Sequence, residues 1–202
     1  MEKLEALKII GDIFRDNKIP FALIGAYAAS AWGVVRATRD IDILIEIKKE
    51  EIERISSELR KKSFQAEIRF GDPEDPLVGV IKLNFKTKDG DESIDLILGI
   101  KKLPKNIFQR TINLTIFEQI IPVVSPEDLV LMKLLAGSPL DIQDAQGIID
   151  VLKEKIDLDY LSIMSRKLRL NLRKLKIEIS QSAFCTKSYW QSPCGRSKNS
   201  SV

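Results

Sequence analysis

Residues 40–47 have the sequence DIDILIEI, in which isoleucine occupies every second position. Successive side chains of a β-strand point to opposite faces of its sheet. The four isoleucines therefore share one face, which predicts a strand that buries this face in a core. Asp40, Asp42, Leu44 and Glu46 share the other face, so the strand would present two carboxylates on the same side.

The aspartate pair indicates a site for a cation. Two like charges held this close are unfavourable unless a cation lies between them. Oxygen ligands without histidine or cysteine suit Mg²⁺ or Mn²⁺. The alternative is a strand end that merely faces water, and Asp40 and Asp42 alone do not decide between the two, because short acidic motifs recur by chance.

A third acid, Asp95, changes this balance. It lies in the apolar run from Ser93 to Leu98, which predicts an interior strand where an unpaired carboxylate would be costly. A lysine or arginine could neutralise it. If the strand instead lies beside residues 40–47, three acids surround one point, as two metal ions about 3.5–4 Å apart require. The third acid favours the metal-site hypothesis.

A glycine turn precedes the acid pair in the sequence. Residues 21–24 are apolar and predict a short buried strand, Gly25 follows, and residues 26–32 are small and predict the start of a helix. Without a side chain, Gly25 would let a phosphate approach the backbone N–H groups at the helix start. The alternative is a glycine that only makes the turn.

Two arginines flank Thr38 immediately before the acid pair. Arg36 and Arg39 could neutralise triphosphate oxygens that metal ions do not reach. Equally, they could form ordinary salt bridges with nearby acids.

The remaining pattern divides the chain into an α/β part and a helical part. We expect helices at 3–16 and 49–62 and further strands at 64–70, 78–87, 92–98, 112–117 and 120–124. Ser125-Pro126-Glu127-Asp128 is a helix-start signature and Gly137 closes that helix, after which helices are expected at 140–153 and 157–178. We predict a domain at 1–124 and a helical subdomain at 125–178, followed at 179–202 by a disordered tail or an extension foreign to the natural chain.

Composition excludes several kinds of protein. The chain has 202 residues and no histidine, which removes Ser-His-Asp and Cys-His catalysis and most catalytic zinc sites. The formal charge of +3 comes from residues 180–202, and the remainder has 29 basic and 29 acidic residues, so no broad nucleic-acid surface is expected. No segment resembles a signal peptide and no apolar run approaches the roughly 20 residues of a membrane span, which favours a soluble, cytoplasmic protein without a membrane partner.

The motifs together resemble the polymerase-beta-type nucleotidyltransferase superfamily, through residues 24–26, 36–45 and Asp95. The chain is most similar to the minimal bacterial and archaeal members related to abortive-infection and toxin–antitoxin nucleotidyltransferases, whose downstream pattern recurs in residues 125–129, Lys133, Asp141 and Asp144. The resemblance implies a small mixed β-sheet flanked by helices.

The resemblance also implies a mechanism. Asp40 and Asp42 would ligate two Mg²⁺ or Mn²⁺ ions, and Asp95 would complete the site and act as general base. Gly25, Ala26, Arg36, Thr38, Arg39 and Lys133 would bind the nucleoside triphosphate, with ATP among the candidates. An acceptor hydroxyl would attack the α-phosphorus and release pyrophosphate. For Lys133 the alternative is a solvated lysine on an amphipathic helix.

Two positions depart from the family's pattern. Ala26 stands where Gly or Ser is usual, which removes any hydroxyl contact, and Ser138 stands where relatives often have Arg. These departures bear on substrate affinity more than on the fold.

Three functional hypotheses remain. The first is an enzyme that transfers a nucleoside monophosphate to a hydroxyl of RNA such as tRNA, of a protein or of a small molecule. The second is an antitoxin-like binding module that holds or modifies a partner toxin. A degenerate, inactive member is the third, and the intact acidic triad argues against it.

A basic helix expected within 161–176 would suit an RNA acceptor, but a solvated surface or a docking face for an acidic partner is the more common use of such a helix. Assembly into a homo-oligomer is compatible with each hypothesis.

Overall fold

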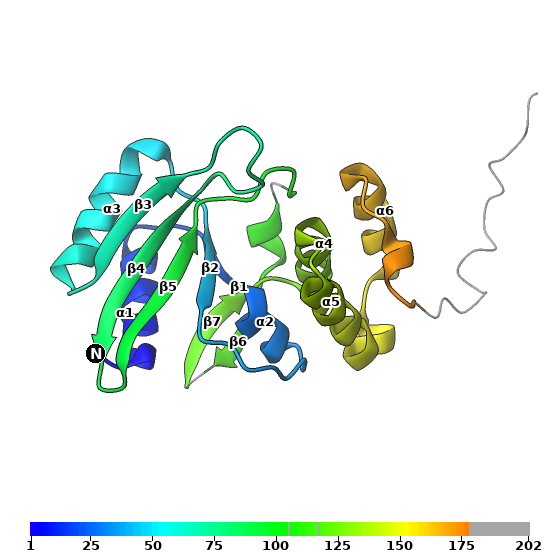
Figure 1. Ribbon diagram of the computed structural model, residues 1–202, viewed down its shortest axis with the longest axis horizontal. Helices are drawn as coiled ribbons and strands as arrows, with labels where there is room; N and C mark the ends of the chain where they lie inside the picture. The colour runs from blue at the N-terminus through cyan, green and yellow to red at the C-terminus, as the bar shows by residue number, and fades with distance from the viewer. Residues whose placement is uncertain (105, 117, 178–202) are drawn as a thin grey trace, which may run out of the picture.

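The computed structural model describes residues 1–104, 106–116 and 118–177. Within these residues, seven strands form one mixed sheet in the order β3-β4-β5-β2-β1-β7-β6 (Figure 1). Pairing is parallel between β2 and β5 and between β1 and β7, and antiparallel elsewhere. The expected mixed sheet flanked by helices is confirmed.

The strands and helices lie close to their expected positions. The strands are β1 (Phe21–Ile24), β2 (Ile41–Ile45), β3 (Gln65–Phe70), β4 (Gly79–Thr87), β5 (Gly90–Ile97), β6 (Ile112–Ile116) and β7 (Gln119–Val123). The helices are α1 (Lys3–Asp16), α2 (Gly25–Ala31), α3 (Lys49–Lys61), α4 (Pro126–Ala136), α5 (Pro139–Leu152) and α6 (Leu158–Leu168), with short 3₁₀ turns at Ile107–Arg110, Lys153–Lys155 and Leu172–Lys174.

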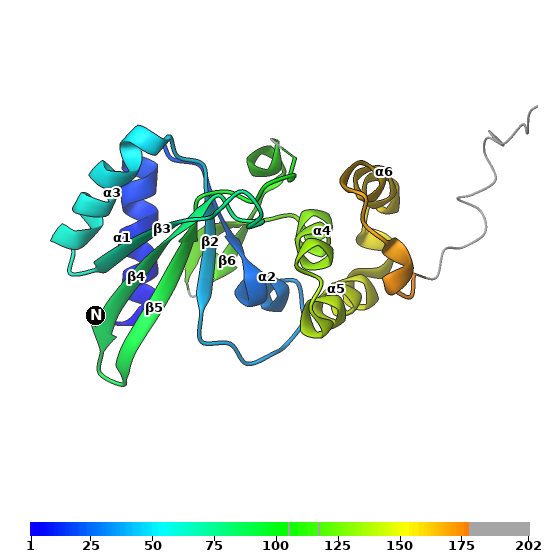
Figure 2. The ribbon, with the colours of Figure 1, turned by 45° about the horizontal axis from the view of Figure 1, so that its top comes forward.

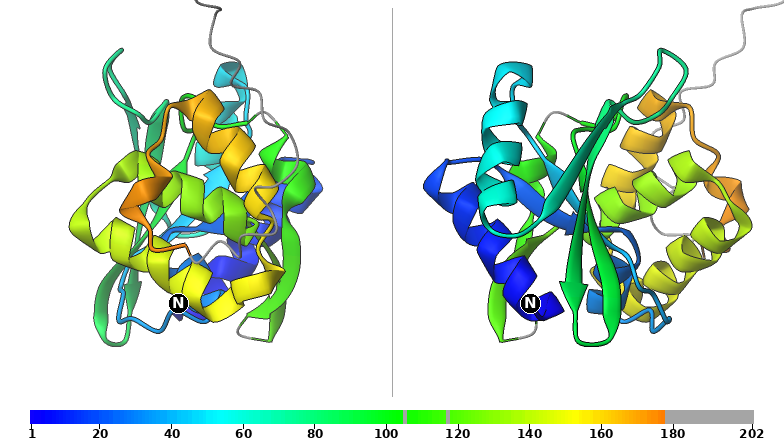
Figure 3. Two further views of the ribbon diagram at one scale, coloured as in Figure 1. Left: turned by 90° about the vertical axis from the view of Figure 1, so that its right-hand side faces the viewer. Right: turned by 60° about the vertical axis from the view of Figure 1, so that its left-hand side comes forward.

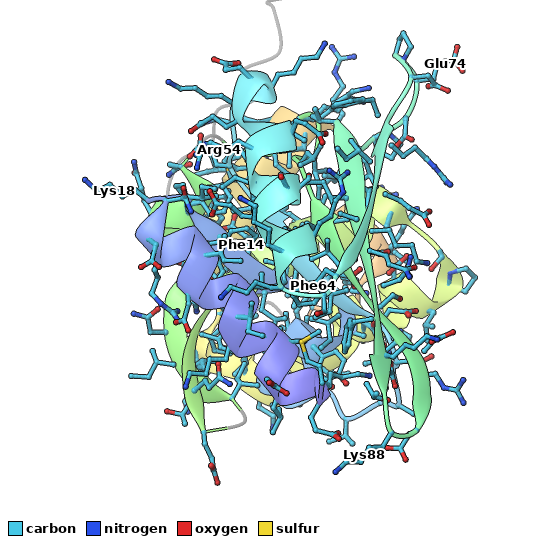
Figure 4. All side chains as sticks on the ribbon, turned by 90° about the vertical axis from the view of Figure 1, so that its left-hand side faces the viewer. Phe14, Lys18, Arg54, Phe64, Glu74 and Lys88 are labelled. Carbon is cyan, nitrogen blue, oxygen red and sulfur yellow. The ribbon has the colours of Figure 1, made fainter. Side chains whose placement is uncertain are left out.

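One face of the sheet is apolar because strand side chains alternate. Ile41, Ile43 and Ile45 are buried there beneath α1 and α3, which face the viewer in Figure 4. Phe14 of α1 packs against Phe21 at a ring distance of 5.4 Å, and Phe64 packs against Phe85 at 5.6 Å. The isoleucine face of residues 40–47 is thus the core face, as the alternation predicts.

The other face of the sheet has a helical covering only over part of its width. Helix α2 contacts β1 and β2, and it is backed in turn by α4 and α5. The helical layer therefore lies on the opposite side of the sheet from α1 and α3 (Figure 3). Helices α4 and α5 cross next to each other, and α6 packs on α4 (Figure 2).

Helix α4 begins and ends at the residues that its capping pattern predicts. The Ser125 side chain accepts a hydrogen bond from the backbone N–H of Asp128, and Pro126 occupies the first turn. Gly137 follows with φ 71°, a left-handed conformation that suits glycine and ends the helix. Helix α5 repeats this start, with the Ser138 side chain accepting from the N–H of Asp141.

The helix expected at 157–178 is wrong in its second half. Helix α6 ends at Leu168, and Arg169 adopts a left-handed conformation with φ 56°. The Asn171 side chain then accepts a hydrogen bond from the N–H of Arg173, which starts a separate turn. The reversal brings Leu175 to 5% exposure in the core, where a straight helix would carry it away. The expected single basic helix therefore does not exist.

Strand β2 begins at Ile41, one residue later than expected, so Asp40 immediately precedes the strand. The tail predicted for 179–202 lies outside the described residues. In the part of the chain that the structure describes, no helix has the length and apolarity to cross a membrane.

A buried polar network fixes the helical part to the sheet. Asp128 is fully buried and accepts hydrogen bonds from Arg110 Nε at 3.1 Å, Ser125 Oγ at 2.9 Å and the Tyr160 hydroxyl at 2.6 Å. The Arg110 guanidinium also pairs with Glu127 and lies 3.7 Å from the centre of the Tyr160 ring. One arginine thus joins the turn before β6 to α4 and α6.

Replacing Arg110 by alanine should destabilise the protein by about 3–5 kcal/mol, because the substitution leaves the buried Asp128 charge without its cation. The measurement is the free energy of unfolding in urea. Arg54→Ala is the matched control, because the ion pairs of Arg54 on α3 are largely exposed and its loss should cost less than about 1 kcal/mol. Equal losses from the two variants would contradict this reading of the network.

Candidate active site

The acidic residues meet where β2 and β5 run side by side. Asp42 of β2 is the direct register partner of Asp95 of β5 in this parallel pair. Partner residues share one face of a sheet, so both side chains lie on the face opposite the isoleucines. Asp40 precedes β2 by one residue and is exposed. The structure therefore pairs Asp42 with Asp95, and the charge of the neighbouring Asp40 acts on both.

Gly25 lies directly beside this acidic group. Its neighbour Ile24 is the register partner of Asp42, and Gly25 itself has φ 67° at the junction of β1 and α2. A Cβ atom at Gly25 would overlap the Asp42 carboxylate. Glycine is therefore required here for two reasons, a left-handed backbone and the close approach of an acid.

The electrostatic environment of Asp42 is unfavourable for its charge. Burial and then the neighbouring charges of Asp95 and Asp40 raise the pKa of Asp42 to about 6, although Lys133 and Arg36 act in the opposite direction. Burial also raises the pKa of Asp95, against the influence of Lys82. The Oδ1 atom of Asp95 is buried and has no hydrogen-bond partner among the described residues.

Lys133 and Arg36 supply positive charge beside Asp42. The Lys133 ammonium lies 2.8 Å from Asp144 and 2.9 Å from Asp141, and Arg36 lies 3.1 Å from Asp144. Lys133 is buried at 8% exposure, so the alternative of a solvated surface lysine is wrong. The Arg36 side chain does form a salt bridge, but its Nε atom is buried without a partner among the described residues.

The other predicted binding residues lie around this centre. Ala26 is buried in the first turn of α2. The Thr38 hydroxyl donates a hydrogen bond to the Asp40 carbonyl at 3.4 Å. Arg39 is exposed, and its backbone carbonyl accepts a hydrogen bond from Lys3. The described residues give Arg39 no ion pair.

The three acids are neighbours, but their side chains do not converge on one metal-ion position. Among the described residues, no three side chains of the metal-ligating types converge closely enough to hold an ion. The donor chemistry nevertheless fits a hard divalent cation: the oxygens belong to three carboxylates, one oxygen has no partner among the described residues, and burial together with mutual repulsion raises the pKa of Asp42. Binding one ion to Asp40, Asp42 and Asp95 together would require these side chains to move closer to one another.

Sequence reasoning missed two features of this region. Lys82 of β4 is the register partner of Asp95 on the side away from Asp42, a relation that no local pattern reveals. Ser138, noted only as a departure from an expected arginine, caps α5 and donates a hydrogen bond to the Asp141 carboxylate at 2.6 Å. A serine before proline and an acid is a recognisable cap signal, so this second role was readable from the sequence.

The sequence profile of a family described as nucleotidyltransferase of unknown function (DUF6036) matches residues 5–177, and the chain belongs to this family. Family and fold together support nucleotidyl transfer as its activity and nucleotides as its substrates. Among curated proteins, no sequence matches this chain.

Solved structures share the fold at low sequence identity. An antigenic nucleotidyltransferase-like protein from Paracoccidioides brasiliensis has a TM-score of 0.53 and 19% identity, over 88% of this chain and 94% of that one. The antibiotic-resistance factor ANT(2'')-Ia has a TM-score of 0.56 and 13% identity, over 83% and 91% of the two chains. JHP933 from Helicobacter pylori has a TM-score of 0.50 and 19% identity, over 81% and 71%.

Gly25→Ala should destabilise the protein by about 2–4 kcal/mol, from left-handed backbone strain plus overlap with Asp42. In an Asp42→Ala background the overlap with the carboxylate is removed, and the backbone strain and the closer Cβ contact at 3.1 Å remain, so the cost should fall to about 1–2 kcal/mol. Urea unfolding of the single and double variants measures both values. Gly137→Ala is the control for strain alone, because Gly137 has a similar φ of 71° and only ordinary contacts around its Cβ position. An equal cost in both backgrounds would refute the proposed packing.

Asp42→Asn should stabilise the metal-free protein, and the gain should depend on pH. Below about pH 4 the carboxyl is protonated in the folded and unfolded states, so little is gained. Between the unfolded pKa of 3.8 and the folded pKa of about 6, ionisation increasingly favours the unfolded wild type. Above pH 6 the gain should level off at about 1–3 kcal/mol.

Thermal unfolding of the two proteins in a chelator across this pH range measures the gain. Asp91→Asn is the matched control, since Asp91 is an exposed residue of the same strand face as Asp95. A stability difference that does not vary with pH would show that the Asp42 charge is not under strain.

Proposed function

We propose that this chain transfers a nucleoside monophosphate from a nucleoside triphosphate to a hydroxyl acceptor, with release of pyrophosphate. The observation that supports this best is the register of β2 and β5, which pairs Asp42 with Asp95 beside Gly25. Asp40, Asp42 and Asp95 would hold two divalent ions, Mg²⁺ or Mn²⁺. Such ions, when bound, neutralise negative charge on the reacting phosphate and on the entering and leaving oxygens.

The triphosphate is assigned to the Asp42 side of the site. Arg36 and Lys133 both place positive charge near Asp42, and their present partners are the carboxylates of Asp141 and Asp144. A triphosphate offers the same kind of anionic oxygen to these cations. Gly25 and Ala26 would present backbone N–H groups, with Thr38 and Arg39 at the entrance.

Asp95 is assigned the role of general base. Its raised pKa, caused first by burial, suits a carboxylate that must accept a proton. The acceptor oxygen forms a bond to the α-phosphorus while the bond from that phosphorus to the oxygen bridging to the β-phosphate breaks. The hydroxyl proton passes to Asp95, and the electron pair of the broken bond leaves with pyrophosphate.

The acceptor class has one structural parallel. ANT(2'')-Ia has been solved in complex with adenylyl-2''-tobramycin, so in that protein the shared fold holds a nucleotidylated small molecule. We propose a small molecule as the first acceptor class to test for the present chain. RNA and a partner protein are the other two classes. A cytoplasmic location belongs to the same proposal.

Incubation with α-labelled triphosphates and Mg²⁺ should transfer label to one of three acceptor pools: small metabolites, total RNA or proteins. Asp42→Asn and Asp95→Asn should each lower the rate by about 100-fold or more, because the substitutions remove charge that the reaction requires. A chelator should abolish transfer. Asp91→Asn is the matched control on β5 and should retain the wild-type rate.

Two outcomes would refute the proposal. One is wild-type activity in Asp42→Asn. The other is the absence of transfer to every pool together with stoichiometric capture of one protein, which would favour an antitoxin-like binding module instead.

A further inference from the structure

The half of the sheet beyond Asp95 has an open polar face. Strands β3, β4 and β5 bury alternate residues such as Ile81, Leu83 and Ile94 against the helices on one side. Their intervening residues point to the other side and are exposed or half-buried: Gln65, Glu67, Lys82, Asn84, Lys86 and Asp91. This open face is continuous with the acidic centre, because Asp95 belongs to it.

One line of register partners, running across the strands of this face, contains Asp95 and Asp42. The register partners are Glu67 with Lys82, Lys82 with Asp95, and Asp95 with Asp42. Neighbouring strands are about 4.8 Å apart, so Lys82 stands as close to Asp95 on one side as Asp42 does on the other. Lys82 is therefore the first cation that a molecule reaching Asp95 from the open face would meet.

The geometry of the reaction places the acceptor on this side. The entering and leaving oxygens lie on opposite sides of the α-phosphorus. If the triphosphate lies towards Gly25, Arg36 and Lys133, as the proposed function holds, the leaving pyrophosphate occupies the Asp42 side. The attacking hydroxyl must then approach over β5 and β4, past Lys82.

The charge of Lys82 is available to a ligand. Its side chain is exposed, and although Glu67 and Asp95 flank it in the register, Lys82 forms no salt bridge within the described part of the chain. A lysine with a free ammonium binds phosphate or carboxylate as a point charge.

The remainder of the face argues for one anionic group and not for a polyanionic chain. The cations Arg69, Lys82 and Lys86 are accompanied there by Glu67, Asp91 and Asp95. A nucleic-acid backbone requires an excess of positive charge along its path, which this balanced face does not supply.

We propose that Lys82 determines acceptor specificity by binding an anionic group, a phosphate or a carboxylate, of a small hydroxyl-bearing acceptor. This inference rests on the proposed function and adds the chemical class of its second substrate. The acceptor's hydroxyl then lies over Asp95 while its anionic group contacts the ammonium on β4.

The test uses calorimetric titration of the full chain saturated with a non-hydrolysable triphosphate and Mg²⁺. The probes are glycerol 3-phosphate, glycerate and glycerol, which share hydroxyl groups and differ in charge. At least one anionic probe should bind about tenfold more tightly than glycerol, and which one does so distinguishes phosphate from carboxylate. Lys82→Gln should remove this preference and Lys82→Arg should retain most of it.

Lys86→Gln is the matched control, because Lys86 is an exposed lysine of the same strand and the same face, four residues from Lys82. It should leave the preference intact. A merely structural Lys82 that neutralises Asp95 would instead alter triphosphate binding or folding stability in the Gln variant without changing the ranking of the probes.

The outcomes separate the two proposals. Failure of the triphosphate to bind wild type overturns the proposed function and this assignment with it. Normal triphosphate binding with equal affinity for charged and uncharged probes, or an anion preference that survives Lys82→Gln, overturns the role of Lys82 alone.

Discussion

Four consecutive residue pairs join β2 to β5 in parallel, from Ile41 opposite Ile94 to Leu44 opposite Ile97. Every second pair is buried against α1 and α3, so a slip of one residue would turn isoleucines towards solvent and carboxylates into the core. The hydrophobic energy of the buried face thus holds the register that pairs Asp42 with Asp95. The acidic centre depends on this pairing more than on any bond that the acids make themselves.

The acidic centre destabilises the fold, because Asp42 and Asp95 are partly buried carboxylates, and neighbouring cations reduce this destabilisation. Burial and mutual repulsion raise the pKa of Asp42, and Lys133 and Arg36 oppose this from the helical side. Lys82 has the same relation to Asp95 from the sheet side. Natural proteins accept such local strain mainly where a ligand relieves it, which is the physical basis for reading this place as an active site.

A second polar cluster serves the opposite purpose. Asp128 is as deeply buried as any residue of the chain, but Arg110, Ser125 and Tyr160 satisfy it completely. It ties α4 and α6 to the sheet and thereby holds Lys133, which lies on the next turns of α4, in place beside Asp42. The contrast between a satisfied cluster and one with an unpartnered Asp95 oxygen separates structural from functional charge.

Local patterns were sufficient for most elements and for the face of the sheet on which Asp42 lies. Alternation with period two, the Ser125 cap and the Gly137 stop are short-range signals, because each depends on side chains within a few residues of one another. The helix expected at 157–178 was wrong because its prediction also used only local periodicity, which continues through Leu172 and Leu175. The burial of Leu175 in the core depends on the chain reversing after Leu168. Which strands are neighbours is a long-range property. Only the folded chain placed Asp95 between Asp42 and Lys82, and Lys133 between Asp141 and Asp144, because these relations arise from the packing of distant segments and leave no periodic trace in the sequence.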